Sequence, residues 1–325
     1  MHESDYFEPR PKDAQGAAPL VLGCMNFGKR TPKAEALQLI AYAEEQGLGL
    51  FDTANAYNDG ESERILGLAM KGKRERFLVA TKVGFGRTAG KPEGLSRQRI
   101  LDACDESLAR LGTDYVDLYY LHVPDHGTPL EESLEAVAGL LASKKIRRWA
   151  VSNYASWQIL EMLPIAERLG MPPPAVAQQL YNPLIRQLDV EYFRFAAKYR
   201  LHTTIYNPLA GGLLTGKHLQ DRSTVRGSRF DNNPFYQKRY WSDAFFAAEG
   251  KLARIAEGEG KTLVQLAYAW AFQRPGVDSV LVGPGTKAHL DAALEARSHV
   301  LSNDALAAVD TVHRELVGTD TSYAR

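Results

Sequence analysis

Short apolar runs alternate with longer amphipathic stretches from residue 19 onward in this chain. The runs are strand candidates, and they begin near residues 20, 49, 77, 116, 148, 175, 203 and 279. Strands that alternate with helical patterns are typical of βαβ units and a parallel sheet. Eight such strands are the number needed to close a barrel, so we expect an α/β fold of the (β/α)8 TIM barrel type.

Two of the stretches between the strands have clear helical spacing and clear ends. Residues 33–46 and 96–111 each place apolar side chains on one face; these are Leu37, Ile40 and Ala41 in the first and Ile100, Cys104, Leu108 and Leu111 in the second. Ser96 is the expected N-cap of the second helix, and Gly47 and Gly112 mark where the two helices end.

An open doubly wound sheet is the alternative architecture for a chain of this pattern. Such a sheet would bind a dinucleotide at a Gly-x-Gly-x-x-Gly turn after its first strand. No turn of this kind follows a strand candidate here, and the segment Gly84-Phe85-Gly86 lacks the third glycine at the required offset. We therefore prefer the barrel, with residues 1–325 as one domain.

Two segments fall outside the strand–helix rhythm: an insertion at about 215–241 and a C-terminal tail at about 314–325. A long polar and aromatic insertion at the catalytic face of a barrel is often a lid or a substrate loop. A packed surface excursion is the alternative, and aromatic content alone does not separate the two.

Composition and charge exclude several classes of protein. Lys plus Arg and Asp plus Glu both number 39, so no net field attracts nucleic acid. Cys24 and Cys104 are 80 positions apart (104 − 24) and form no Cys-x-x-Cys, which indicates neither a disulfide framework nor a zinc site. The sequence shows no secretory signal pattern and no run long enough to span a bilayer. We expect a cytoplasmic protein without a metal, nucleic-acid or membrane partner.

Four polar residues of complementary chemistry follow the strand candidates. Asp52, Lys82 and His122 each lie at the end of a run, and Tyr57 lies in the loop after the first of them. In a parallel barrel these strand ends meet at one face. A phenol has a pKa of about 10, which a neighbouring ammonium lowers, while a carboxylate can hold that ammonium and a histidine can orient a carbonyl. The set suits protonation of an oxygen while a hydride reaches the adjacent carbon.

With these residues in view, the chain resembles the aldo-keto reductases over nearly its whole length. Residues 47–57 contain the family's Asp-Thr-Ala-x-x-Tyr pattern, which Gly60-Glu61-Ser62-Glu63 follows, and residues 107–118 lead to His122 in the family's manner. The resemblance implies that Tyr57 is the general acid in reduction, that Lys82 and Asp52 tune it, and that His122 orients the substrate carbonyl. It also implies NADPH as the cofactor, with NADH as an alternative.

Further positions match the family's nicotinamide and pyrophosphate sites. Ser152, Asn153 and Gln178 would bind the nicotinamide carboxamide, and Tyr206 would stack on the ring. Residues 207–217 resemble the pyrophosphate loop, in which glycines let backbone N–H groups approach an anion. The cofactor contacts implied there are Asn207, Pro208, Leu209, Gly211, Leu213, Gly216 and Lys217.

The segment 283–293, after the last strand, resembles the family's adenosine-phosphate site. The positions implied to bind the cofactor are Gly283, Gly285, Thr286, Lys287 and His289. The family often has Gln at the position of His289 and Asn at that of Ala293. Thr286 and Lys287 are still expected to bind a 2′-phosphate at a helix N-terminus, which favours NADPH.

Within the family, the chain looks most like the aflatoxin aldehyde and succinic semialdehyde reductases, because of the 207–217 loop, the Tyr236-x-x-Arg239-Tyr240-Trp241 segment and the last four residues. By that resemblance Tyr236, Arg239 and Arg325 would face the substrate, with Arg229 nearer the cofactor. A guanidinium binds a carboxylate through two hydrogen bonds, which would favour carboxyl-bearing aldehydes. A tail arginine without a role in the site is the alternative.

These inferences predict NADPH-dependent reduction of aldehydes and some ketones to alcohols. One alternative is the same chemistry run oxidatively, by an NAD(P)-dependent sugar or alcohol dehydrogenase. Another is a redox-sensing regulatory subunit, since the fold is similar to that of the cytoplasmic β-subunits of potassium channels. The expected partner is a small carbonyl substrate, and the insertion and tail leave a homo-oligomer open.

Overall fold

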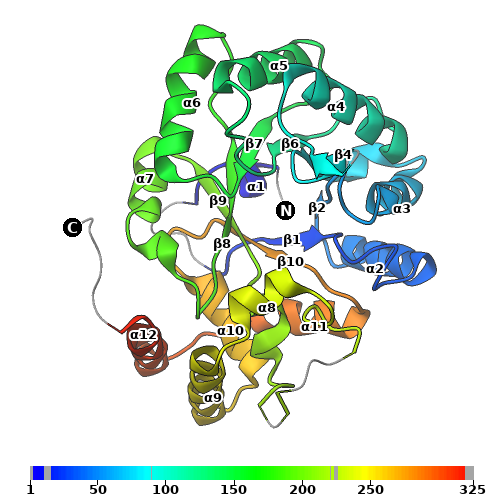
Figure 1. Ribbon diagram of the computed structural model, residues 1–325. Helices are drawn as coiled ribbons and strands as arrows, with labels where there is room; N and C mark the ends of the chain where they lie inside the picture. The colour runs from blue at the N-terminus through cyan, green and yellow to red at the C-terminus, as the bar shows by residue number, and fades with distance from the viewer. Residues whose placement is uncertain (1–2, 11–15, 89, 220, 223–225, 319–325) are drawn as a thin grey trace.

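A computed structural model describes residues 3–10, 16–88, 90–219, 221–222 and 226–318. Eight parallel strands in these ranges close into one barrel, and helices surround it (Figure 1). The strands, in their order around the barrel, are β1 (Leu20–Gly23), β10 (Ser279–Val282), β9 (His202–Tyr206), β8 (Val176–Leu180), β7 (Trp149–Ser152), β6 (Leu118–Leu121), β3 (Leu78–Val83) and β2 (Leu50–Asp52). The predicted (β/α)8 TIM barrel is confirmed.

The helices follow the strands as the parallel connections require. The helices that alternate with the strands are α2 (Lys33–Glu45), α3 (Glu61–Met70), α4 (Arg97–Leu111), α5 (Leu130–Ala142), α6 (Ser156–Arg168), α7 (Tyr192–Tyr199), α10 (Leu263–Gln273) and α11 (Lys287–Ala296). Two more, α9 (Asp243–Gly258) and α12 (Asn303–Val317), pack on each other outside this ring (Figure 1). The shorter elements are α1 (Ser4–Phe7), α8 (Pro234–Tyr240), the hairpin β4 (Arg87–Thr88) and β5 (Lys91–Pro92), and the 3₁₀ helices η1 (Arg74–Arg76), η2 (Gln187–Asp189) and η3 (Ala210–Thr215).

The apolar core has two parts. The larger fills the space between the barrel and the helices, and the smaller lies inside the barrel, where Val21, Leu50, Leu118 and Val176 are buried. Helix α1 lies within the ring of strands in Figure 1, and its Tyr6 packs on this inner cluster. Because apolar side chains fill one part of the barrel interior, where α1 packs on them, the other part is left for buried polar side chains.

The two helices expected from spacing are present, with one correction. Ser96 caps α4 by accepting a hydrogen bond from Arg99 N (3.4 Å), and Gly112 ends it with φ 64°. The four residues expected on the buried face of α4 are buried. In α2, however, Ala41 is exposed, and the prediction that it shares the buried face is wrong. The buried stripe of α2 runs through residues 36, 39, 40 and 43, and one further step of about 100° turns residue 41 toward solvent.

The insertion and the tail differ in how far the structure follows them. The insertion contains α8, and it buries Phe230 and Tyr240 completely. Residues 314–317, expected to open the tail, instead form the last turn of α12, because Leu316 continues the packed face that Val309 and Val312 begin. Arg325 lies outside the described residues. No helix in the described part of the chain is long and apolar enough to cross a membrane.

Candidate active site

A buried ion pair lies at the carboxyl ends of β2 and β3. Lys82 Nζ pairs with Asp52 Oδ1, and the two side chains are only 0% and 3% exposed. The ammonium also donates to Thr53 O (2.8 Å), while the second Asp52 oxygen accepts from Gln178 Nε2 (2.9 Å). Because each charge has a second hydrogen-bond partner, both side chains are fixed in one arrangement.

Tyr57 and His122 lie next to this ion pair. Lys82 Nζ is 5.2 Å from the centre of the Tyr57 ring, and the Tyr57 and His122 ring centres are 5.8 Å apart in an edge-on arrangement. His122 is buried, and Tyr57 is partly exposed. The structure thus brings together all four residues that the strand ends indicated.

The electrostatics of Tyr57 differ from what the sequence suggested. We expected Lys82 to lower the pKa of the phenol, but burial, followed by the charge of Asp52, raises the pKa of Tyr57 well above 10. The physical reason is that the ammonium already pairs with Asp52, so its attraction for a phenolate is largely cancelled. The phenol therefore keeps its proton near neutral pH, as a proton donor must.

His122 is held in its neutral form. Burial, followed by the nearby Lys82 charge, lowers its pKa well below 6.5. A neutral imidazole carries one donor and one acceptor nitrogen. His122 Nδ1 is buried without a hydrogen-bond partner in the described part of the chain. An uncharged donor next to Tyr57 can orient a carbonyl oxygen without competing for the transferred proton.

The residues expected to hold a nicotinamide form a connected network beside the ion pair. Ser152 Oγ donates to Gln178 O (2.9 Å), and Asn153 Nδ2 donates to His122 O (2.9 Å). The Tyr206 hydroxyl donates to Asn153 Oδ1 (2.7 Å). Since Gln178 also bonds to Asp52, the expected carboxamide site and the expected catalytic residues share one hydrogen-bond network.

The expected pyrophosphate loop turns on left-handed glycines. Gly211, Gly212 and Gly216 have φ values of 71°, 102° and 80°, and Asn207 Oδ1 fixes the loop by accepting from Gly211 N (2.9 Å). Pro208 and Leu209 lead into η3, where Leu213 is buried as an anchor. Lys217 Nζ would lie 3.9 Å from a Cβ placed on Gly212. Left-handed glycines, which present no Cβ, and an ammonium thus lie at the same loop, which is a suitable arrangement for close approach of a phosphate.

Two arginines add positive charge near this loop, and sequence reasoning missed one of them, Arg30. The pKa of Arg30 is lowered mainly by burial and secondly by the charge of Arg229. The pKa of Lys217 is lowered mainly by burial and secondly by the charge of Arg30. Arg229 donates to Asn26 Oδ1 (3.1 Å) and to the Tyr236 hydroxyl (3.1 Å). Three cations held near one another favour a bound anion. Arg30 follows β1, so the same strand-end argument applied to the first strand would have found it.

The expected adenosine-phosphate site begins the helix α11. Thr286 caps this helix by accepting from His289 N (3.3 Å), and Gly285 N donates to His289 Nδ1 (3.3 Å). Gly283 O accepts from Asn26 Nδ2 (3.0 Å), which ties this loop to the one after β1. Lys287 Nζ lies 4.1 Å above the ring of Tyr42. His289, where the family often has Gln, therefore has a structural role in the turn.

Of the residues expected to face the substrate, Tyr236 and Arg239 lie near the candidate site. The charge of Arg239 opposes the rise that burial gives to the pKa of Tyr206, and the guanidinium lies 4.4 Å from the centre of the Phe235 ring, so Arg239 lies near the expected nicotinamide network. Tyr236 accepts from Arg229 and packs against Tyr240. Arg325 lies outside the described residues.

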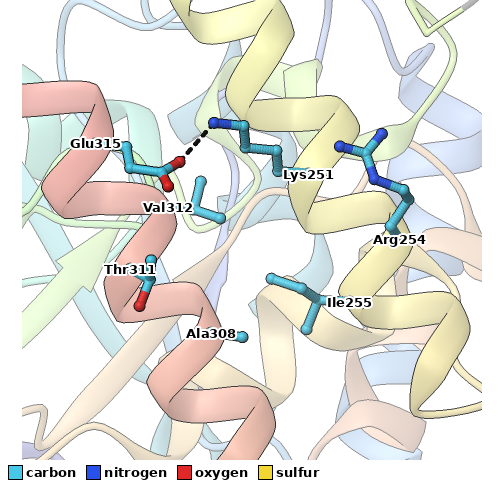
Figure 2. Close-up of a pocket in the computed structure, with 7 residues that line it drawn as sticks. All are labelled: Lys251, Arg254, Ile255, Ala308, Thr311, Val312 and Glu315. Carbon is cyan, nitrogen blue, oxygen red and sulfur yellow. Dashed lines mark hydrogen bonds and ion pairs between the residues drawn. The ribbon is translucent and has the colours of Figure 1, made fainter.

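Other surface features do not compete with this site. A groove of about 560 Å³ lies between α9 and α12 (Figure 2), and none of its lining residues is one of the predicted site residues. In the same described ranges, no three His, Cys, Asp or Glu side chains gather as a metal site would require. Arg74 and Arg147 both form ion pairs with the buried Asp117, so their charges stabilise the fold rather than form a separate binding site.

Comparison with known proteins decides the family. The family model described as "Aldo/keto reductase family" matches residues 19–314. The chain belongs to the aldo/keto reductase family. This aldo-keto reductase is 34% identical over 294 residues to the human aflatoxin B1 aldehyde reductase member 2, covering 85% of the chain and 80% of that protein. It is 31% identical over 278 residues to a probable voltage-gated potassium channel subunit beta of Arabidopsis thaliana, covering 84% of each. It is also 31% identical over 286 residues to the aldo-keto reductase YhdN of Bacillus subtilis, covering 87% of the chain and 84% of that protein.

Membership in this family supports an NAD(P)H-dependent oxidoreductase that acts on small carbonyl compounds. The glycine-rich loop and the cations beside it fit the phosphates of a nicotinamide dinucleotide, and the hydrogen-bond network around Asn153 and Gln178 fits its carboxamide. The protein is therefore an enzyme of carbonyl reduction or of its reverse.

Proposed function

We propose that this aldo-keto reductase is a cytoplasmic enzyme that uses NADPH to reduce aldehydes, and some ketones, to alcohols. The observation that carries this proposal is the Tyr57 ring 5.8 Å from that of His122 and 5.2 Å from the ammonium of a buried Asp52–Lys82 pair. A phenol that keeps its proton near neutral pH is suited to protonating an oxygen at which negative charge develops. NADPH, when bound, would supply the hydride.

The roles of the protein's own groups follow from their contacts. His122 donates a hydrogen bond to the substrate oxygen and sets its distance from Tyr57. Tyr57 gives its phenolic proton to that oxygen. The Lys82 ammonium, held by Asp52, lies 5.2 Å from the centre of the Tyr57 ring and holds that ring in place. Ser152, Asn153 and Gln178, which belong to one hydrogen-bond network, would orient the carboxamide of the cofactor, and Tyr206 would cover its ring.

The cofactor's phosphates would occupy the cationic region described above. Lys217, Arg229 and the η3 backbone suit the pyrophosphate, and Thr286 and Lys287 at the start of α11 suit a 2′-phosphate. This last feature is the basis for preferring NADPH to NADH. Tyr236 and Arg239 would lie beside the substrate, where Arg239 could bind a carboxylate, as Arg325 would by family analogy.

The regulatory alternative rests on a specific observation, namely the similarity to a plant potassium channel β-subunit. Steady-state assays with NADPH and NADH, run in both directions against 4-nitrobenzaldehyde, succinic semialdehyde and an aliphatic aldehyde, separate the alternatives. Fast reduction with NADPH supports the reductase, and faster alcohol oxidation with NAD⁺ would favour the dehydrogenase. Tight NADPH binding without turnover would favour the regulatory subunit.

A further inference from the structure

A buried glutamate fastens the loop that follows β3. Glu93 Oε2 accepts from Gly84 N (2.8 Å) and from Gly86 N (3.0 Å), and Glu93 N in turn donates to Gly86 O (2.9 Å). The Glu93 side chain is only 3% exposed. Two backbone N–H groups that converge on one carboxylate oxygen hold this short loop firmly.

The same carboxylate also holds the loop that carries the proton donor. Glu93 Oε1 accepts from Asn55 Nδ2 (2.6 Å) and from Arg99 Nε (3.1 Å). Asn55 lies between Asp52 and Tyr57, and its backbone N–H donates to Lys82 O (3.1 Å). Glu93 therefore joins two loops at the catalytic face, one leading to Tyr57 and one leading away from Lys82.

The residue between the two fastened glycines is an exposed aromatic side chain beside the catalytic histidine. Phe85 is 54% exposed, and its ring centre lies 5.1 Å from that of His122. Gly84 has φ 108°, which a residue with a Cβ rarely adopts, and a Cβ on Gly86 would lie 3.0 Å from Glu93 Oε2. The loop geometry that points Phe85 at His122 thus depends on both glycines and on Glu93.

An exposed phenyl ring in contact with a catalytic residue is an apolar surface that a substrate can cover. Covering it with a flat or apolar group removes apolar area from water and allows an aromatic contact. A small aliphatic aldehyde could reach Tyr57 and His122 without covering the ring.

We propose that Glu93 is a positioning residue that holds Phe85 as one wall of the substrate site, and that the enzyme therefore favours aldehydes carrying a flat apolar group. This inference rests on the proposed function, because it concerns the substrate of the same site. Glu93 itself touches neither the substrate nor the reacting atoms.

The test compares KM and kcat for benzaldehyde and propanal in four proteins: wild type, Phe85→Ala, Glu93→Gln and Glu106→Gln. Glu106 is the matched control, because it also pairs with Arg99 (2.7 Å) but makes no contact with the loop in the described hydrogen bonds. We expect Phe85→Ala and Glu93→Gln to raise the KM for benzaldehyde about tenfold and that for propanal less than about twofold. Glu106→Gln should leave the KM values for both aldehydes unchanged.

The inference is overturned if Phe85→Ala and Glu93→Gln change the KM values for the two aldehydes equally or change neither KM. Far-UV circular dichroism checks that each variant is folded. If Glu93→Gln does not fold, Gly86→Ala displaces the same loop from the carboxylate and should give the same selective rise in KM. An unselective effect of Gly86→Ala would contradict the inference equally.

Failure of the proposed function gives a different result from failure of this inference. If the wild type reduces neither aldehyde, the reductase proposal fails, and Phe85 is tested by binding alone. Titration calorimetry of benzyl alcohol and propanol into the protein with NADP⁺ then decides. Loss of benzyl alcohol binding in Phe85→Ala supports the aromatic wall, and unchanged binding overturns it.

Discussion

Replacing Lys82 with methionine would leave the Asp52 carboxylate buried with Gln178 as its remaining hydrogen-bonding side chain. In the wild type the two charges form an almost fully buried pair. Removing one partner of such a pair typically costs about 3–5 kcal/mol, because the other charge stays desolvated. We therefore expect Lys82→Met to lower the free energy of unfolding at pH 7 by that amount.

The cost should also depend on pH, with a sign that the structure fixes. Burial raises the pKa of Asp52, and Lys82 is the main group that opposes this rise. Without Lys82, the folded carboxyl keeps its proton well above the unfolded pKa of about 3.9, so unfolding releases a proton. Stability is then lost as the pH rises above the unfolded pKa, by about 1.4 kcal/mol per pH unit until the folded pKa is reached.

The assay is urea unfolding of the wild type, Lys82→Met and Asp52→Asn/Lys82→Met at pH 5, 6 and 7, followed by both circular dichroism and fluorescence to check that the transitions coincide. The double variant has no buried charge at positions 52 and 82, so it should be more stable than Lys82→Met and should lack the additional pH dependence. The reasoning is refuted if Lys82→Met lies within about 1 kcal/mol of the wild type at every pH.

Three further predictions follow from other contacts. Because burial and then Asp52 raise the pKa of Tyr57 well above 10, and His122 stays neutral, kcat for reduction should be flat from pH 6 to 9 and fall only at more alkaline pH, as steady-state pH profiles would show. Lys287→Ala should weaken NADPH binding about tenfold and leave NADH binding unchanged, as fluorescence titration would show, since Lys287 is expected to meet only the 2′-phosphate. Glu249 is buried without a hydrogen-bond partner in the described ranges, and burial raises its pKa to about 7. A raised carboxyl pKa lowers stability as the pH climbs from about 4.3 to 7. The free energy of unfolding of Glu249→Gln, measured by urea unfolding, should therefore rise relative to that of the wild type by about 2–3 kcal/mol between pH 5 and pH 8.

Much of the fold and of the candidate active site could be predicted because both follow from strand positions. The strand starts at 20, 49, 77, 116, 148, 175, 203 and 279 each lie within two residues of a strand in the barrel. Parallel strands that close a barrel must bring their ends together, so residue types at those ends were enough to assemble Asp52, Lys82 and His122.

What the sequence could not show depends on side-chain geometry or on burial. The pKa of Tyr57 was expected to fall, but Lys82 is already paired with Asp52, which no spacing reveals. Glu93 follows no barrel strand directly, and its function depends on which backbone N–H groups converge on it. The exposure of Ala41 depends on which face of α2 packs on the barrel, and helical spacing alone did not decide between neighbouring faces.

The most direct test of the central claim is the single-turnover rate of 4-nitrobenzaldehyde reduction by NADPH in the wild type and in Tyr57→Phe. The phenylalanine keeps the ring and removes only the hydroxyl that donates the proton. We expect the rate to fall by about 10²–10⁴ while NADPH binding, followed by fluorescence titration, is unchanged. A Tyr57→Phe variant that reduces the aldehyde within about threefold of the wild-type rate would contradict Tyr57 as the general acid.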